Sequence, residues 1–419
     1  MRLQVFRVCA AAVALATIDP CFAQAELCHA ERNPGAHALN EMTWKQLNAI
    51  YEDVGEEHYD QAYEDLQKML GRAGRDNYLQ AVLNQALAQV EWARGNYAPS
   101  LRYFEQAVDL DVLPDATHFA LMYQIAQLYF MNDQYEQALD RLELWFCKAP
   151  EEKISATAYV LQAAILARKE DYRATLEAID KAIAMDPEPQ EQWYRLKLAA
   201  HFELKQYPEA AETLEVMITR WSESRAYWLQ LAQVRIQLNQ DDMALAVLAL
   251  AHRKNLLTEQ SDITLLCSLY SHSDLPYKAA EILEGAIIDG IVPADQKHWT
   301  QVADAWYAAE ELEKALQAYG EAGKAAEDGH IDLRRAYLLV DLERWQGALD
   351  TLDRALQKGG LDDRKTGEAY LLRGMAWFNL GNYDKAGADW GRAGRHEKSR
   401  EAAGQWMNHL QEEQRRRAS

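Results

Sequence analysis

Small residues recur along this 419-residue chain at intervals of 33 to 38 residues. These marker residues stand at Ala62, Ser100, Ala138, Thr175, Ala210, Ala244, Ala279, Ala315, Ala348 and Ala386. A fixed period of this length is typical of repeat proteins, in which one unit cannot bury its apolar face alone and stacks on its neighbours. The spacing therefore excludes a single compact core and predicts an array of similar units.

Two further columns keep step with the marker residues. An aromatic residue usually stands three positions earlier, as Tyr59, Tyr97, Tyr135, Tyr172, Tyr207, Trp345 and Tyr383. A small residue stands twelve positions earlier, where two helices would cross, as Ala88, Ala126, Ala163, Ala232, Cys267, Ala303, Ala336 and Gly374. Columns of this kind with a period near 34 are typical of tetratricopeptide repeats, each of which is a pair of helices.

The stretch Tyr370–Ala393 carries the unit in its most complete form. Tyr370, Gly374 and Trp377 share one helical face, and Gly381 ends that helix before a second amphipathic helix begins. The sequence thus predicts an all-α solenoid, a right-handed superhelix of about ten helix pairs over residues 43–396. An extended lead-in over 26–42 precedes it, and a capping helix with a basic tail over 397–419 follows. In that cap, Trp406 and Leu410 are expected to face the last pair.

The first 25 residues have the pattern of a secretory signal peptide. Arg2 and Arg7 precede the uncharged run Val8 to Ile18, which is too short to span a bilayer. Ala23-Gln24-Ala25 then offers a small-x-small cleavage site, so we expect the mature chain to start near Glu26. The alternative is an apolar N-terminal helix of a cytosolic protein. No later stretch predicts a membrane span or a lipid anchor, so we expect an exported protein without stable membrane insertion.

Three of the five cysteines lie beyond the predicted signal peptide: Cys28, Cys147 and Cys267. Cys267 occupies a small-residue position of a repeat and is expected to be core. An odd number of cysteines in an oxidising compartment permits one disulfide and one free thiol. Whether Cys28 and Cys147 form that disulfide stays open at this point.

Charge and motifs exclude several classes of function. The formal net charge of −21 argues against nucleic acid or an anionic membrane as the main partner. The sequence holds no H-E-x-x-H motif, no phosphate loop after a strand and no nucleophile elbow. We therefore predict no catalytic residue, no cofactor and no metal site, and a protein that is not an enzyme. The enzyme alternative would need a buried, unpaired polar cluster built across repeats.

The predicted binding surface is the concave face, which the first helix of each pair lines in tetratricopeptide proteins. One column on these helices, eight residues before the marker, is aromatic at five of nine positions and suits contact with an extended or helical peptide. The alternative is that these aromatic residues pack against the next repeat. With the polar residues around the column, the candidate partner-binding residues are Trp92, Tyr123, Gln127, Phe130, Arg195, Phe202, Gln233, Lys297, Asp304, Tyr307, Tyr337 and Phe378.

Three stretches carry a closer resemblance: residues 113–129, 191–205 and 244–280. Together they resemble the periplasmic tetratricopeptide proteins associated with TonB–ExbB–ExbD energy-transduction systems of Gram-negative bacteria. The resemblance implies a periplasmic scaffold whose partners are TonB, ExbB, ExbD or a TonB-dependent receptor, and it supplies no catalytic residues. The alternative is an assembly factor for another envelope complex, in outer-membrane, pilus or polysaccharide secretion.

Overall fold

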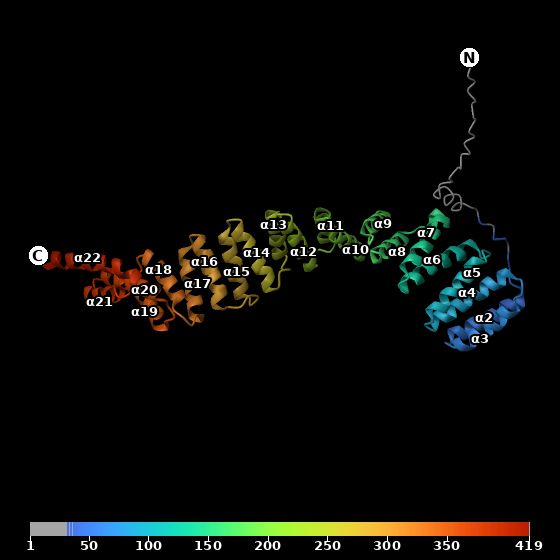
Figure 1. Cartoon of the computed structure of the whole chain (residues 1–419), viewed down its shortest axis with the longest axis horizontal. Helices are drawn as coiled ribbons and strands as arrows, with labels where there is room; N and C mark the ends of the chain where they lie inside the picture. The colour runs from blue at the N-terminus through green and yellow to red at the C-terminus, as the bar shows by residue number, and fades with distance from the viewer. Residues whose placement is uncertain (1–31, 33, 36, 419) are drawn as a thin grey trace, which may run out of the picture. The chain divides into compact units, whose positions relative to one another are not determined.

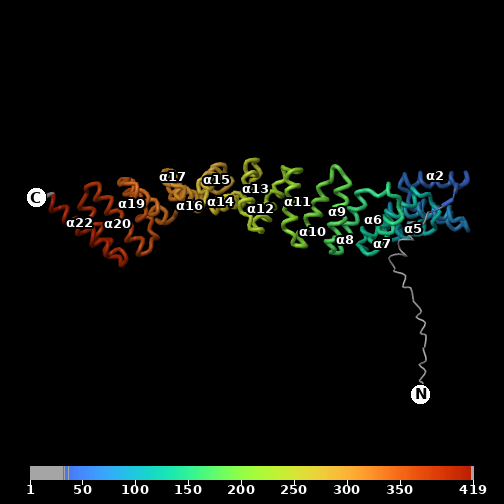
Figure 2. The backbone as a smooth tube through the Cα atoms, turned by 90° about the horizontal axis from the view of Figure 1, so that it is seen from above, coloured from blue at the N-terminus to red at the C-terminus, as the bar shows by residue number. Residues whose placement is uncertain are grey.

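The computed structural model describes residues 32, 34, 35 and 37–418, and over these residues the chain is helical without a strand. The predicted all-α fold of successive helix pairs is confirmed. The helices fall into two compact units, residues 1–213 and 214–419. Figures 1 and 2 show within each unit that consecutive helices run alongside one another. The predicted signal peptide lies outside the described residues.

The N-terminal unit contains α2 (Glu41–Gly55), α3 (Tyr59–Arg72), α4 (Asn77–Ala93), α5 (Tyr97–Asp109), α6 (Asp115–Met131), α7 (Tyr135–Lys148), α8 (Ala156–Arg168), α9 (Tyr172–Met185) and α10 (Glu191–Glu203). The boundary falls inside α11 (Tyr207–Arg220). The C-terminal unit contains α12 (Arg225–Gln237), α13 (Asp241–Arg253), α14 (Gln260–His272), α15 (Pro276–Ile288), α16 (Gln296–Ala308), α17 (Leu312–Ala325), α18 (His330–Asp341), α19 (Trp345–Lys358), α20 (Asp363–Asn379), α21 (Tyr383–Ala393) and α22 (Arg400–Ala418).

The marker residues lie where the repeat pattern predicts. All ten are at most 3% exposed, so each second helix presents its small residue to the packed interior. The column three residues earlier is the first residue of every second helix, from Tyr59 of α3 to Tyr383 of α21. At Gly374 the reason for a small residue is explicit, because a Cβ there would lie 2.4 Å from Nε1 of the buried Trp390.

Each helix pair turns at a residue with a left-handed backbone, five positions before the marker. These ten residues have φ between 54° and 77°: Glu57, Gly95, Asp133, Glu170, Lys205, Asn239, Asp274, Glu310, Glu343 and Gly381. At each corner the next N–H closes the helix end, as when Asn382 N donates to Trp377 O at 2.8 Å. This is the Schellman pattern, which usually favours glycine. Only two of these ten corner residues are glycine, Gly95 and Gly381. A search of the sequence for glycine therefore misses most of the corners.

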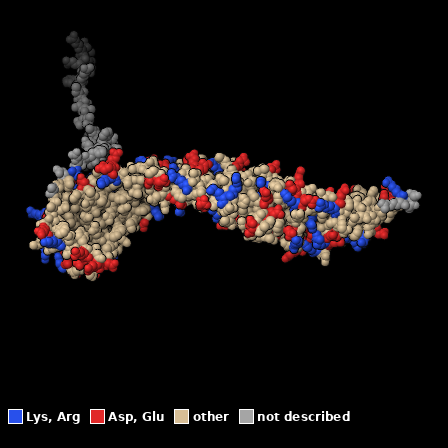
Figure 3. Space-filling model, turned by 180° about the vertical axis from the view of Figure 1, so that it is seen from behind, with Lys and Arg blue, Asp and Glu red and all other residues tan. Residues whose placement is uncertain are grey.

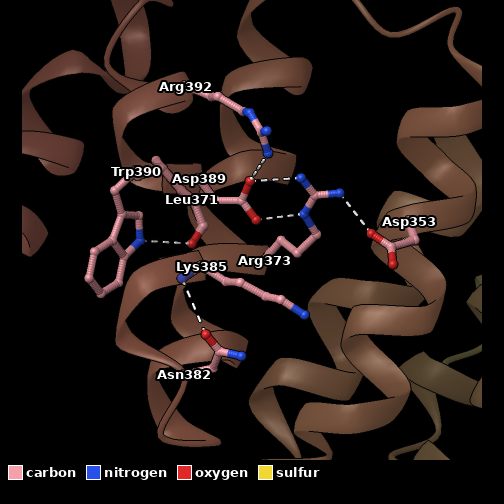
Figure 4. A network of polar contacts seen from close by, with 8 residues as sticks. All are labelled: Asp353, Leu371, Arg373, Asn382, Lys385, Asp389, Trp390 and Arg392. Atoms are coloured by element: carbon pink, nitrogen blue, oxygen red, sulfur yellow. Dashed lines mark hydrogen bonds and ion pairs between the residues drawn. The ribbon is translucent and has the colours of Figure 1, made fainter. Parts of the chain in front are cut away.

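Buried carboxylates join helices of the C-terminal unit. Asp389 of α21 is 2% exposed and receives two hydrogen bonds from Arg373 of α20, at 2.6 and 2.7 Å. Arg392 adds a third at 2.7 Å, and Arg373 also reaches Asp353 of α19 at 2.7 Å (Figure 4). One arginine thus ties the last helix pair to the pair before it through paired, hydrogen-bonded charges.

The C-terminal helix α22 covers the last pair. Leu410 is 4% exposed, and the Trp406 ring stacks on Trp390 with 5.3 Å between ring centroids. Both side chains therefore face the last repeat, as their four-residue spacing predicts. Among the described residues, no helix is long and apolar enough to cross a membrane.

The two described cysteines differ in their bonding, since Cys267 is a free thiol and Cys147 forms a disulfide. Cys267 is free and 8% exposed, which confirms the prediction that it belongs to the core. Cys147 is disulfide-bonded. Whether its partner is Cys28 stays open, because Cys28 lies outside the described residues.

The lead-in is fixed to the N-terminal unit through Arg32. Its guanidinium pairs with Asp111 at 2.7 Å and with Asp115, and it donates to Leu113 O at 3.0 Å. The same group lies over the Phe119 ring, 5.6 Å from its centroid. The Arg32 side chain is only 10% exposed, so these contacts hold the chain against the loop between α5 and α6.

His118, beside this anchor, gives the N-terminal unit a pH dependence. Burial and the neighbouring Arg32 lower the pKa of His118 from 6.5 to about 4. As pH falls, His118 is therefore protonated in the unfolded chain before it is protonated in the folded chain. The stabilisation from the neutral imidazole is therefore complete above pH 6.5 and is lost as pH falls to 4.

We expect the folded chain to lose up to about 3 kcal/mol of stability between pH 6.5 and pH 4 through His118. Urea unfolding of the parent and of His118→Leu at pH 7 and pH 4 checks this, because the variant should lose less stability than the parent; parallel losses would contradict it.

Candidate peptide-binding groove

Two adjoining cavities lie on the first helices of the C-terminal unit. The larger, about 540 Å³, is formed mainly by α14 and α16, and the smaller, about 290 Å³, by α16 and α18 with one residue of α17. Asp304 of α16 lines both cavities, so they adjoin at this side chain, and we call the two together the groove. Residues 15, 11, 8 and 7 positions before the marker line this groove: Thr264, Ser268, Ser271, Asp304, Tyr307, Ala308, Tyr337 and Asp341. The position eleven residues before the marker lines the groove in all three first helices and therefore marks the inner face of a repeat. Positions 14 and 10 residues before the marker also line the groove on two helices, as Gln301, Ala305, Arg334 and Leu338.

Three predicted residues meet in this groove: Asp304, Tyr307 and Tyr337. Asp304 accepts a hydrogen bond from Tyr319 OH at 2.5 Å and pairs with Arg334 at 2.8 Å. Tyr337 OH donates to Glu368 at 2.8 Å while its ring stays 38% exposed. Tyr307 is 53% exposed and leaves a flat ring available for a ligand.

Two tyrosines of the groove, Tyr319 and Tyr337, stay protonated at neutral pH. Burial, and then the hydrogen bond to Asp304, raise the pKa of Tyr319. Burial and Glu368 likewise raise the pKa of Tyr337. Their hydroxyls are therefore neutral donors, and the charge of the groove comes from its carboxylates and from Arg334.

Cys267 lies at the floor of the larger cavity but is not a reactive thiol. Burial raises its pKa to about 12, and its Sγ donates to Ala279 O at 3.4 Å. Since the thiolate is the nucleophile, a thiol with this pKa serves packing.

In the aromatic column eight residues before the marker, three rings pack within their own helix pair rather than against the next repeat. Trp92, Phe130 and Phe378 pack on the tyrosine that opens the following helix, with centroid distances of 5.1, 5.9 and 5.2 Å. Phe378 also contacts Trp390 and Trp406. These contacts favour packing at those positions, whereas Tyr307 of the same column is open to a partner.

The remaining candidate residues are not brought together with the groove. Arg195 of α10, Gln233 of α12 and Lys297 of α16 are exposed, and Phe202 of α10 is half-buried. Tyr123 and Gln127 lie on α6 of the N-terminal unit, where Tyr123 OH reaches Thr157 O at 3.4 Å. Their role in partner binding stays a prediction.

Sequence reasoning missed several groove residues. Ser268 and Thr264 occupy inner-face positions, so the repeat register alone identifies them. Arg334 stands fourteen residues before its marker, as Gln301 does in the preceding pair, so the register also identifies it. Tyr319 does not follow from that register, because it comes from the second helix α17. Only the packing of α17 between α16 and α18 brings it to Asp304.

A metal centre or a catalytic cluster would require a particular set of polar side chains near the groove. The described residues hold no group of three or more histidine, cysteine or acidic side chains that could bind a metal. Buried polar atoms without a hydrogen bond, within the same part of the chain, are Asn84 Oδ1, His118 Nδ1, Asp332 Oδ2 and Arg335 Nε. None of these residues lines the groove, so the enzyme alternative finds no buried, unpaired cluster there.

Comparison with known proteins agrees with a helical repeat. Residues 333–404 match the tetratricopeptide repeat family. Tetratricopeptide repeats are therefore present from α18 into α22, and the same columns continue through the other helix pairs. No curated protein sequence matches the chain.

Three solved structures illustrate the similarity. A tetratricopeptide repeat protein from Parabacteroides merdae ATCC 43184 aligns with 68% of this chain and 94% of its own, at 13% identity and a TM-score of 0.38. The structure of Naa15/Naa10 bound to HypK-THB aligns over 88% and 66%, at 13% identity and a TM-score of 0.44. MamA from Desulfovibrio magneticus RS-1 aligns over 45% and 99%, at 20% identity and a TM-score of 0.36. All three similarities are low, so the fold assignment depends on the helix pairs themselves.

Proposed function

We propose that this protein is a non-enzymatic periplasmic scaffold that binds a protein partner in the groove between α14 and α18. The observation that carries the proposal is the groove of two adjoining cavities around Asp304, with Tyr307 and Tyr337 on its surface. An open, elongated groove with flat rings and hydrogen-bonding side chains suits a peptide segment.

The chemistry of the groove favours a segment with basic residues. Asp274 and Asp341 are exposed carboxylates, and the ion pair with Arg334 neutralises part of the charge of Asp304. Ser268 and Ser271 offer hydroxyls to a peptide backbone between them. Carboxylates near a groove also speed encounter with a cationic partner.

The partner that we propose is a component of a TonB system. The resemblance of residues 113–129, 191–205 and 244–280 supports this, as does the fit between an acidic groove and the basic, proline-rich periplasmic segments typical of TonB proteins. The signal-like residues 1–25 support export to the periplasm. The alternative, an assembly factor for another envelope complex, would use the same groove with a different partner.

Binding measurements with purified chain test this proposal. The periplasmic segments of TonB and ExbD and a TonB-dependent receptor from the same organism are titrated against it, together with in-vivo crosslinking that includes ExbB. We expect one of these proteins to bind with an affinity that weakens as salt rises. Binding by none of them would overturn the TonB assignment, and recovery of an uncleaved chain in the cytosol would overturn the location.

The double variant Tyr307→Ala/Tyr337→Ala is expected to weaken partner binding by about tenfold or more, because exposed tyrosines at the centre of a groove are typical hot spots. Met243→Ala/Leu250→Ala is the matched control, since it removes two exposed side chains from the second helix α13. Titration calorimetry and melting curves of both variants provide the measurement. Equal affinity of the groove variant and the parent would mean that the partner binds elsewhere.

A further inference from the structure

Three of the five first helices of the N-terminal unit, α4, α6 and α8, are nearly free of charge, whereas α2 and α10 carry four charged residues each. Helices α4, α6 and α8 carry three charged residues between them: Glu91, Asp115 and Arg168. The second helices that follow them, α5, α7 and α9, carry three, five and four. The chain as a whole is 26% charged, so the absence of charge is confined to one side of these repeats.

None of the three charged residues stands in the middle of the inner face. Glu91 is 4% exposed and is held by Arg94 at 2.9 Å and Asn96 at 2.6 Å. Asp115 and Arg168 are the first residue of α6 and the last residue of α8. The middle of each first helix therefore offers only neutral groups.

The neutral groups are aromatic rings and amides. At the position eleven residues before the marker stand Tyr51, Gln89 and Gln127, all exposed, on α2, α4 and α6. Four residues earlier on α4 and α6 stand Gln85 and Tyr123, both half-buried. Since this register lines the cavities of the C-terminal unit, the five residues lie on the inner face. Figure 3 shows a broad uncharged face on the N-terminal unit, bordered by charged side chains.

We propose that this inner face binds an uncharged, proline-rich peptide segment in the polyproline II conformation. Such a segment has no internal hydrogen bonds, so its carbonyl groups need donors from the surface that it lies on. The amide N–H groups of Gln85 and Gln89 are donors of this kind, and Gln127 keeps one of its two N–H groups for a ligand beside its hydrogen bond to Tyr123. Tyrosine rings pack against proline rings. The segment is already extended, so little conformational entropy is lost when it binds.

The absence of charge decides against other ligands. A basic or acidic peptide would lose water from its charged groups on this face without gaining a partner of opposite charge. The inference rests on the proposed role in protein binding, but it concerns a surface separate from the groove around Asp304. A neutral stretch of a partner would bind this inner face, and a basic stretch would bind the groove around Asp304.

Titration calorimetry with synthetic peptides tests the proposal. The probe is an uncharged, proline-rich peptide of about a dozen residues with blocked ends, which spans about 37 Å in polyproline II. We expect the purified chain to bind it with an affinity that is the same at low and high salt, since no charges are paired. A glycine- and serine-rich peptide of equal length is expected not to bind.

The variant Gln89→Glu/Gln127→Glu keeps side-chain size, removes two donors and adds charge to the face. We expect it to weaken binding about tenfold or more. Gln106→Glu/Gln137→Glu makes the same change at exposed positions of α5 and α7 and should leave affinity unchanged. Tyr307→Ala/Tyr337→Ala should also leave it unchanged, which separates this inference from the proposed function.

Three outcomes would overturn the inference. The proline-rich peptide fails to bind a chain whose melting curve shows it to be folded, or it binds the Gln89→Glu/Gln127→Glu variant as well as the parent. In the third, a neutral oligosaccharide binds this face and the peptide does not.

Discussion

Gly329→Ala is expected to destabilise the C-terminal unit by about 3 kcal/mol, the upper end of typical overpacking costs. A Cβ on Gly329 would lie 2.1 Å from Ala355 O and 2.8 Å from its carbonyl carbon. These are backbone atoms of α19, so no side-chain rotation relieves the clash. The amide of Gly329 also donates to Gly359 O at 2.9 Å, and a shift of the loop would weaken that hydrogen bond.

Thermal unfolding followed by circular dichroism measures this effect, with an expected fall of about 6–12 °C in the midpoint for a unit of this size. Gly391→Ala is the matched control, because a Cβ at this position of α21 would meet nothing within 4 Å. That control should be neutral or slightly stabilising, since alanine is the better helix former. Equal midpoints for Gly329→Ala and Gly391→Ala would show that the approach to Ala355 is not as close as described.

The second large effect is expected for Asp389→Ala, at about 3 kcal/mol. Removing one partner of a buried ion pair leaves the other charge without compensation, which typically costs 3–5 kcal/mol. We place this variant at the low end because Arg373 keeps Asp353, and because the Arg392 side chain is 51% exposed. The loss should appear first in the last helix pair and α22, since stability in a repeat array depends on neighbour interfaces.

Urea unfolding combined with amide hydrogen exchange of α20 to α22 measures this loss. Asp350→Ala, at an exposed site on α19, is the control and should change stability by less than about 0.5 kcal/mol. If Asp389→Ala unfolds at the same urea concentration as Asp350→Ala, the network in Figure 4 does not stabilise the fold.

The sequence predicts the helix pairs well because their signals are local and repeated. The small marker residues, from Ala62 to Ala386, are buried as their register requires. The aromatic column correctly places the first residue of the second helices. The left-handed corners are harder to find, because residues such as Glu170 and Lys205 adopt a conformation for which glycine is the usual sign.

The candidate site is predicted less completely. Asp304, Tyr307 and Tyr337 come together because they belong to the inner-face register of adjacent pairs. Trp92 and Phe378 share the column of Tyr307 but pack on neighbouring rings. The two outcomes go with different residues at the start of the second helix of the same repeat. That residue is a tyrosine after Trp92 and Phe378, but it is Leu312 after Tyr307.

The sequence by itself determined the repeat, its register and the all-α fold, because helix periodicity and small crossing residues act within one unit. The charge of the first helices, acidic near Asp304 and neutral on α4, α6 and α8, also follows directly from the sequence. Tertiary structure alone decided the close approach of Gly329 to Ala355, the burial of Asp389 and the joining of two cavities at Asp304. Each of these depends on residues of different helices, 16 positions apart in the case of Asp389 and Arg373, which only the packing of one helix on another brings into contact.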